Sequence, residues 1–400
     1  MAKEISSIQL FNSGIKIKRS SLFLYFLLIP SLIAYHAFDR AKLIYFIPAI
    51  MIALFLFENL FSSGKERGLR FEPNMVFSLI LYLTLMLTGL ILNYESINYK
   101  AFIRDILIIL SPIIVFIMKM SFNEQHIKWL FIASVISYFA WVGIDFEFDW
   151  SFNFVRSNYN MSSEFHNGVI LGCFFLFFIY RKMFLWAIPA AILILMSGKR
   201  SIILGVLPAM ATYYLFIRPL NIDKNKYWLA LILAIYFFIF YAIGTNLDSF
   251  AKWFLDFIGI DSSDSLNRFL MGREVFISYL KAHINQSDLL QFLFGYGPGQ
   301  ADVFTHDVIR PDWGAEKREF VNPHNDILKI RFDYGLIGSL SLFLLFYSSY
   351  VKSKMGIQIF LYSIPLLLVD NSFIFIYYWF IALVVARFEV EDISELSSSG

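Results

Sequence analysis

Long apolar runs are the feature that most constrains how this chain can fold. About twelve of them follow one another, most of them close to the roughly 20 residues that a helix needs to cross the hydrocarbon of a bilayer. This pattern predicts an all-α polytopic membrane protein with about twelve transmembrane helices. The runs occupy residues 21–38, 41–61, 74–93, 101–120, 127–146, 167–180, 184–196, 201–217, 227–245, 334–350, 357–369 and 372–386.

The composition agrees with a membrane protein and excludes several other classes. Hydrophobic residues make up 58% of the 400 residues and charged residues 16%, whereas about a quarter of a soluble domain is charged. The net charge of +2 and the scattered basic residues argue against nucleic-acid binding. The single cysteine, Cys173, cannot form an intramolecular disulfide or a multi-cysteine metal site. No histidine pair has ligand spacing, so we expect no metal site.

The distribution of Lys and Arg predicts the orientation of the helices. We interpret the first run as a retained transmembrane helix, because no small-residue cleavage site follows it. With the N-terminus inside, the short inner segments hold more than twice as many Lys and Arg residues as the outer ones, as the positive-inside rule requires. Both termini are then cytoplasmic. The predicted inner residues include Arg181, Lys182, Arg218, Lys226 and Lys354.

The same orientation divides the chain into three parts. Residues 1–245 carry nine transmembrane helices, residues 246–331 form one large external loop, and residues 332–400 carry the last three helices and a cytoplasmic tail. Within the loop, residues 265–282 have apolar positions at helical spacing, interleaved with Arg268 and Arg273. The following GYGPG segment predicts a tight turn. The rest of the loop contains His306, Arg310 and Arg318, which we interpret as substrate contacts without an assigned role.

A polar cluster marks the end of the external loop. His324, Asn325 and Asp326 precede the tenth helix, and Lys329, Arg331 and Asp333 follow them. A histidine can take a proton from a hydroxyl near neutral pH, and Asn or Asp can orient a substrate. The alternative is that the NPHND segment only caps the helix. Both interpretations stay open on spacing alone.

A second cluster, Lys199-Arg200, lies in the short external turn between the seventh and eighth helices. Two adjacent cations on the outer side go against the positive-inside tendency. They suit the oxygens of a diphosphate, although they could also extend toward lipid headgroups. Near the outer end of the fourth helix, Arg104 and Asp105 are expected to pair with each other.

The order of these motifs resembles the O-antigen polymerase and O-antigen ligase superfamily of bacterial envelope glycosyltransferases. The resemblance covers residues 195–346 and is carried by SGKRS, MGREVFISYL, LFGYGPGQ and PHNDILKIRFDYGLIG, in that order and on the predicted outer side. It implies a lipid-dependent glycosyltransferase fold of the GT-C-like type in the bacterial inner membrane, with the active site facing the periplasm. It also implies metal-independent, inverting transfer from undecaprenyl-diphosphate-linked oligosaccharides, without a cofactor.

The resemblance also implies roles for individual residues. His324 is then the catalytic base, and Arg200 and Arg273 hold the donor diphosphate. Further substrate-binding candidates are Lys199, Asn325, Arg268, Asp326, Arg310 and Arg318. We expect lipid-linked oligosaccharides and membrane lipids as partners, with a chain-length regulator and a flippase as protein partners.

Three functions remain in competition. The second histidine that ligases often carry before the His-Asn step is absent here, where Val321, Asn322 and Pro323 precede His324. This favours a polymerase, which joins one lipid-linked repeat unit to another, over a ligase, which transfers the glycan to lipid A core. A transporter of lipid-linked glycan or solute is the third possibility. It predicts ionisable residues deep in the membrane helices, and the sequence places few there.

Overall fold

The computed structural model describes residues 7–9, 16–38, 46–47, 49–53, 72–93, 99–117, 120, 122–142, 168–197, 200–220, 224–257, 259, 274–307, 325–369 and 375–388. This part of the chain is helical except for one short antiparallel pair, in which β1 (Ser7–Gln9) bonds to β2 (Lys16–Lys18). The predicted all-α class is therefore confirmed.

The helices follow the predicted apolar runs closely. Every run contains a helix, except that most of residues 41–61 lie outside the described part. The N-terminal half holds α1 (Arg19–Ser21), η1 (Leu22–Leu28), α2 (Ile29–Phe38), α4 (Pro73–Leu92), α5 (Tyr99–Ile117), α6 (Glu124–Val142), α7 (Val169–Tyr180) and α8 (Phe184–Met196). The C-terminal half holds α9 (Arg200–Thr212), η6 (Tyr213–Ile217), α10 (Lys226–Thr245), α11 (Leu247–Phe257), α13 (Glu274–Gln286), α14 (Leu289–Phe294), α15 (Gln300–Asp307), α16 (Asp326–Tyr350), α17 (Lys354–Val369) and α18 (Ile376–Ala386).

Three of the described helices are long and apolar enough to cross a membrane: α4, α10 and α16. The described part also contains shorter apolar helices of 10 to 17 residues, whereas α5 and α6 have 19 residues each and are not among the three candidate spans. The described part of the chain is therefore all-α, with three helices long and apolar enough to span a membrane, and the number twelve stays a prediction.

The core between these helices is aromatic and closely packed. Tyr362 of α17 lies where a Cβ on Gly172 of α7 or on Gly205 of α9 would collide with it. Its hydroxyl donates to the carbonyl of Val169, 2.6 Å away. Two glycines thus let three helices approach one buried tyrosine, and the hydrogen bond satisfies its only polar group.

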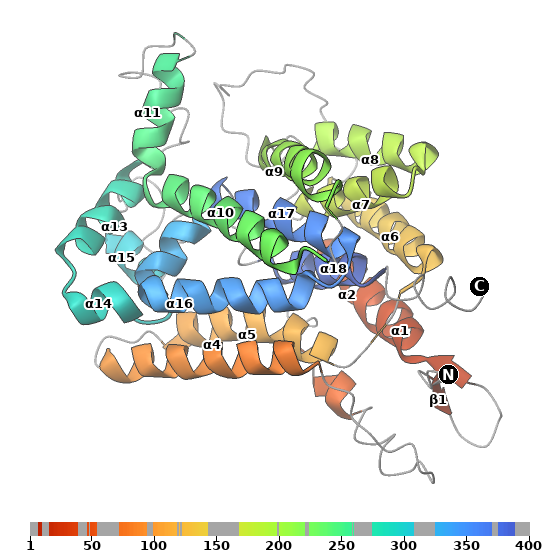
Figure 1. Ribbon diagram of the computed structural model, residues 1–400. Helices are drawn as coiled ribbons and strands as arrows, with labels where there is room; N and C mark the ends of the chain where they lie inside the picture. The colour runs from red at the N-terminus through yellow and green to blue at the C-terminus, as the bar shows by residue number, and fades with distance from the viewer. Residues whose placement is uncertain are drawn as a thin grey trace.

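Helix α16 organises the rest of the fold. It packs against α4, α10 and α17, and α13, α14 and α15 gather at the end where it begins (Figure 1). The helix begins at Asp326, eight residues before the predicted apolar run. The helix thus begins where the NPHND cap predicts it, and the apolar run that starts at Tyr334 covers only its later part, because Lys329 and Asp333 are charged residues whose partners lie inside the protein. The helix breaks once, at Gly335, where φ is 66° and ψ is −165°.

Candidate functional site

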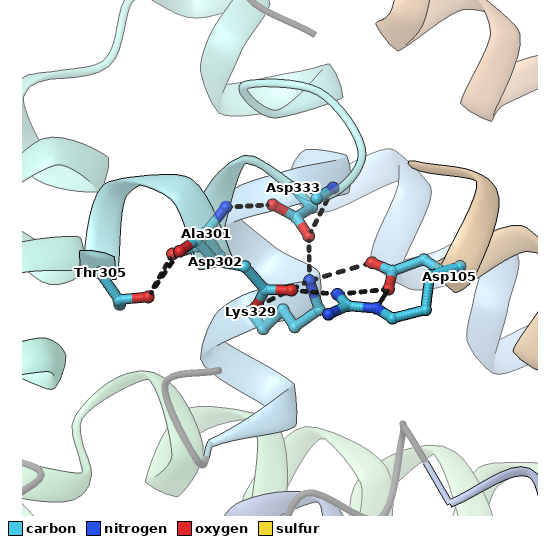
Figure 2. Close-up of polar contacts among 8 residues, drawn as sticks. Asp105, Ala301, Asp302, Thr305, Lys329 and Asp333 are labelled. Carbon is cyan, nitrogen blue, oxygen red and sulfur yellow. Dashed lines mark hydrogen bonds and ion pairs between the residues drawn. The ribbon is translucent and has the colours of Figure 1, made fainter. Parts of the chain in front are cut away.

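A cluster of buried charges joins α16 to α5 and α15. At its centre, Lys329 Nζ lies 2.8 Å from Asp333 Oδ2 and 2.9 Å from Asp105 Oδ2. Asp302 Oδ1 is the third carboxylate oxygen around it, at 3.3 Å. Figure 2 shows the lysine side chain reaching between the three carboxylates. All four side chains are fully buried, so the ion pairs are shielded from screening by water and salt.

Arg104 supplies a second cation at the edge of this cluster. Its Nη2 lies 2.8 Å from Asp105 Oδ1, and the same nitrogen pairs with Asp302. The Arg104 side chain is 21% exposed, in contrast to the four residues inside. The predicted pairing of Arg104 with Asp105 is confirmed. Three carboxylates therefore face two cations, and we name Arg104, Asp105, Asp302, Lys329 and Asp333 the charge cluster.

Asp333 also binds the beginning of α15. Its two carboxylate oxygens accept hydrogen bonds from the backbone N–H groups of Gly299, at 3.1 Å, and Ala301, at 2.7 Å (Figure 2). The first N–H groups of a helix have no partner within the helix and carry a partial positive charge. A carboxylate there satisfies them, so Asp333 fixes α15 against α16.

The GYGPG segment, residues 295–299, crosses α16 at the break of that helix, and we name this segment the glycine turn. The helix interruption at Gly335 deprives the preceding carbonyls of their regular intrahelical donors, and the turn replaces them. Tyr296 N–H donates to Phe332 O at 2.9 Å, and Gly297 N–H donates to Asp333 O at 3.0 Å. Gly295 and Gly335 lie so close that a Cβ on either would collide with the other segment's backbone. The turn is therefore a packed element of the site.

The tyrosine of this turn extends the contact to α13. The Tyr296 ring stacks on Phe332, with 4.4 Å between ring centroids, and its hydroxyl donates to the carbonyl of His283 at 2.8 Å. Burial raises the pKa of Tyr296, so the hydroxyl keeps its proton and stays a donor at neutral pH.

Asn325 caps the beginning of α16. Its side-chain oxygen accepts from the backbone N–H of Leu328 at 3.0 Å, and its amide nitrogen donates to Gly244 O, near the end of α10, at 2.7 Å. The capping interpretation of this segment is thus confirmed for Asn325. Asp326 is the first residue of the helix and is fully buried. Its substrate-binding role stays a prediction, as does that of Asn325.

The other predicted site residues cannot be placed relative to one another, because they or their side chains lie outside the described part. Arg200 begins α9, and its side chain is outside the described part. The remaining predicted site residues all lie outside the described residues: Lys199, Arg268, Arg273, Arg310, Arg318 and His324. The same is true of the side chain of His306.

Sequence reasoning missed the charge cluster as a unit. Lys329 and Asp333 were noted near the closing motif, and their spacing of four residues on one helix face is a signal for an ion pair. Asp302 gave no such signal, because it follows a turn and its partners are distant in sequence. Arg331, in contrast, is not part of the charge cluster. Its Nη1 donates to Phe292 O of α14 at 2.6 Å.

The arrangement can hold the beginning of α15 against α5 and α16. Among the described residues, no group of three His, Cys, Asp or Glu side chains is placed to hold a metal ion. The three carboxylates of the charge cluster surround an ammonium group instead. In comparisons with known proteins, no family model and no curated protein matches this chain.

Proposed function

We propose that this protein is a glycan polymerase of the bacterial inner membrane. It transfers an oligosaccharide from undecaprenyl diphosphate to the acceptor sugar of a second lipid-linked repeat unit, on the periplasmic face. The proposal includes about twelve membrane helices, cytoplasmic termini and a GT-C-like fold, in which residues 246–331 form the external loop.

In the proposed reaction, the acceptor hydroxyl attacks the anomeric carbon of the donor sugar from the side opposite the diphosphate. The bond between that carbon and the diphosphate oxygen breaks, with inversion. His324 takes the hydroxyl proton, and Arg200 and Arg273 stabilise the negative charge that develops on the leaving diphosphate. Fixed cations and a base suffice for this transfer.

One observation supports this proposal above the others: the segment of residues 295–307, which is predicted to be external, is anchored at the beginning of α16. The charge cluster and the Asp333–α15 contact hold residues 295–307 directly beside the helix that follows the PHND motif. Group transfer requires catalytic and binding groups held in fixed positions. A segment bound by buried ion pairs meets that requirement, and the motif order of the O-antigen polymerase and ligase superfamily suggests the chemistry.

Substitution of the proposed base tests the reaction. We expect His324→Ala and Arg200→Ala each to abolish polymer while leaving the amount of protein in the membrane unchanged. Arg200→Lys should also be impaired, because lysine cannot bind phosphate with two parallel hydrogen bonds. Lys226→Ala, which removes a cation elsewhere on the chain, is the control. Polymer of normal length from the His324→Ala protein would disprove the role of the histidine.

The ligase is the nearest alternative, and a deletion strain separates the two. Loss of the long-chain ladder with retention of single-repeat lipopolysaccharide indicates a polymerase. Loss of every glycan-capped lipopolysaccharide indicates a ligase. The lipid-linked intermediate that accumulates in this strain identifies the substrate in either case.

The transporter alternative gains weight from a specific observation. Lys329 and Asp333 lie within a helix long enough to span a membrane, and Asp105 lies within α5. Ionisable residues in membrane helices often mark a transport pathway. A reconstituted system in which the lipid-linked substrate is supplied on the outer side separates the two functions. If this protein is a transporter, polymerisation there should continue when the protein is left out. The polymerase proposal requires that this protein be present there.

A further inference from the structure

A second polar region lies away from the charge cluster, where α7 and η6 end and α17 begins. An open cavity of about 320 Å³ is lined there by Tyr180, Arg181, Lys182, Tyr213, Arg218 and Lys354. Four of these six side chains are cationic and none is acidic. The volume is in the lower part of the range of about 300 to 1,000 Å³ that is usual for small-ligand sites. We name these six residues the basic pocket.

The backbone at the end of α7 is strained in a way that brings a cation to this pocket. Lys182 has φ of 57° and is the only non-glycine residue with positive φ among the described residues. Met183 N–H bonds to Phe178 O and Lys182 N–H to Ile179 O, the hydrogen bonds of a Schellman helix end. Glycine is the usual residue at this position. A lysine there is unfavourable for the fold, which points to a use for its charge.

The two arginines of the basic pocket are held by aromatic rings. The Arg181 guanidinium lies 4.9 Å from the ring centre of Phe388, and that of Arg218 lies 5.4 Å from the ring centre of Tyr214. Such stacking leaves the planar edge of a guanidinium able to donate two parallel hydrogen bonds to an anion.

The carboxylate of Glu124 lies near the pocket, and its contact with Arg181 is long. Glu124 Oε1 is 2.6 Å from Lys128 Nζ, and its Oε2 is 3.8 Å from Arg181 Nη2. Its single charge is thus shared between two cations, with the shorter contact to the lysine outside the pocket. The positive-inside rule accounts for basic residues on this face, but it does not account for four of them around one cavity.

We propose that the basic pocket binds a phosphate group. The sources with this chemistry are the headgroup of an anionic phospholipid in the cytoplasmic leaflet, where Arg181, Lys182, Arg218 and Lys354 are predicted to lie, and a soluble phosphate compound. The proposal is independent of glycan transfer, because no residue assigned to that reaction lines the pocket.

Lipid binding by the full-length protein tests the first source. Protein purified in detergent is titrated with phosphatidylglycerol or phosphatidylcholine, and bound lipid is counted by native mass spectrometry. We expect wild type to prefer phosphatidylglycerol and the Arg181→Gln/Arg218→Gln protein to bind it about tenfold more weakly, since charge-assisted hydrogen bonds are lost. Lys226→Gln, an exposed lysine on the same predicted face that does not line the pocket, should bind as wild type does. Equal binding by all three proteins would overturn the lipid source.

Inorganic phosphate tests the second source. Its effect on the melting temperature is measured in nanodiscs made only of phosphatidylcholine. Stabilisation of wild type and of Lys226→Gln, but not of the double variant, indicates a soluble phosphate compound. No effect of phosphate, together with selective binding of phosphatidylglycerol, indicates the lipid. If the double variant matches wild type in both experiments, the pocket binds no phosphate and the proposal is wrong.

The Lys182→Gly variant separates a loss of binding from a loss of stability. Glycine removes the charge and also relieves the positive φ, so this protein should melt at a higher temperature than wild type and yet bind phosphatidylglycerol or phosphate more weakly. A purely structural lysine would give the higher melting temperature without the loss of binding, and that result would contradict the proposal.

Discussion

Lys329 illustrates how a charge can be placed inside a membrane protein. Its ammonium group meets three carboxylates within 3.3 Å, and all four side chains are shielded from water. Removing one member of a buried ionic group leaves the others unpaired, which costs more than the pair itself contributes. The residue is therefore essential to the anchoring of α15, whichever reaction the protein performs.

We expect Lys329→Met to destabilise the protein by about 3 to 5 kcal/mol, because uncompensated carboxylates remain buried. Lys281→Met is the matched control. Its ammonium lies 3.0 Å from Asp248, but both side chains are 24% exposed, and such pairs contribute at most about 1 kcal/mol. Melting temperatures in detergent compare the two variants. If both variants lower the melting temperature by a similar amount, the charge cluster is not buried as described.

Gly335 has a backbone conformation that essentially only glycine adopts, with φ of 66° and ψ of −165°. A Cβ there would also collide with backbone atoms of Leu293 and Gly295. We expect Gly335→Ala to prevent accumulation of folded protein. Gly259→Ala separates the backbone strain from the steric collision. Gly259 also has a positive φ, of 76°, but nothing lies within 4 Å of the added Cβ.

Gly259→Ala should lower the free energy of unfolding only by the cost of the positive φ, about 1 to 2 kcal/mol. Size-exclusion chromatography of the fluorescently tagged proteins measures the folded fraction. If Gly335→Ala folds as well as Gly259→Ala, the close crossing of the glycine turn and α16 is incorrect.

At the scale of elements, the helices were predictable and their contacts were not. Apolar runs bounded by charges and turns located α4, α7 and α10 within two residues of their ends. The apolar run begins only at Tyr334, eight residues after the start of α16, because Lys329 and Asp333 are polar and their partners from α5 and α15 are encoded by no local pattern. Asp302 was not predicted either, because its partners are distant in sequence. The cap at Asn325, in contrast, was predicted from the local NPHND motif.

The contact between the glycine turn and α4 can be tested by a cross-link. A Cβ on Gly297 would lie 3.5 Å from the Cβ of Asn93, a separation that a disulfide spans. We expect Asn93→Cys/Gly297→Cys to form a disulfide under mild oxidation, and Asn93→Cys/Gly259→Cys to form none. Cys173 is buried and should not interfere. Thiol labelling measures the reaction.

The same variant examines whether the turn moves during the reaction. If the turn is only a scaffold, polymer formation should survive oxidation and should not change when the disulfide is reduced. Activity that appears only after reduction would show that the turn has to leave α4 during catalysis.

At the scale of the whole molecule, the proposed function depends on which side of the membrane each end of the helices faces. We expect reporter fusions after Lys199 and near Asp312 to report an external location, and a fusion after Lys182 a cytoplasmic one, because inner segments are richer in Lys and Arg. A cytoplasmic signal at either external position would overturn both the topology and the proposed periplasmic reaction.

The break and the charges at the beginning of α16 have a consequence for biogenesis. Of the three helices long enough to span a membrane, α16 has the lowest mean hydropathy, and a charged residue costs about 2.5 to 3.5 kcal/mol at the centre of an inserting helix. Two of the three carboxylates around Lys329, Asp105 of α5 and Asp302 of α15, belong to helices that are synthesised before α16, and the third, Asp333, belongs to α16 itself. Two counter-charges of Lys329 are therefore synthesised before it, and we expect α16 to insert beside a partly assembled protein that already contains them.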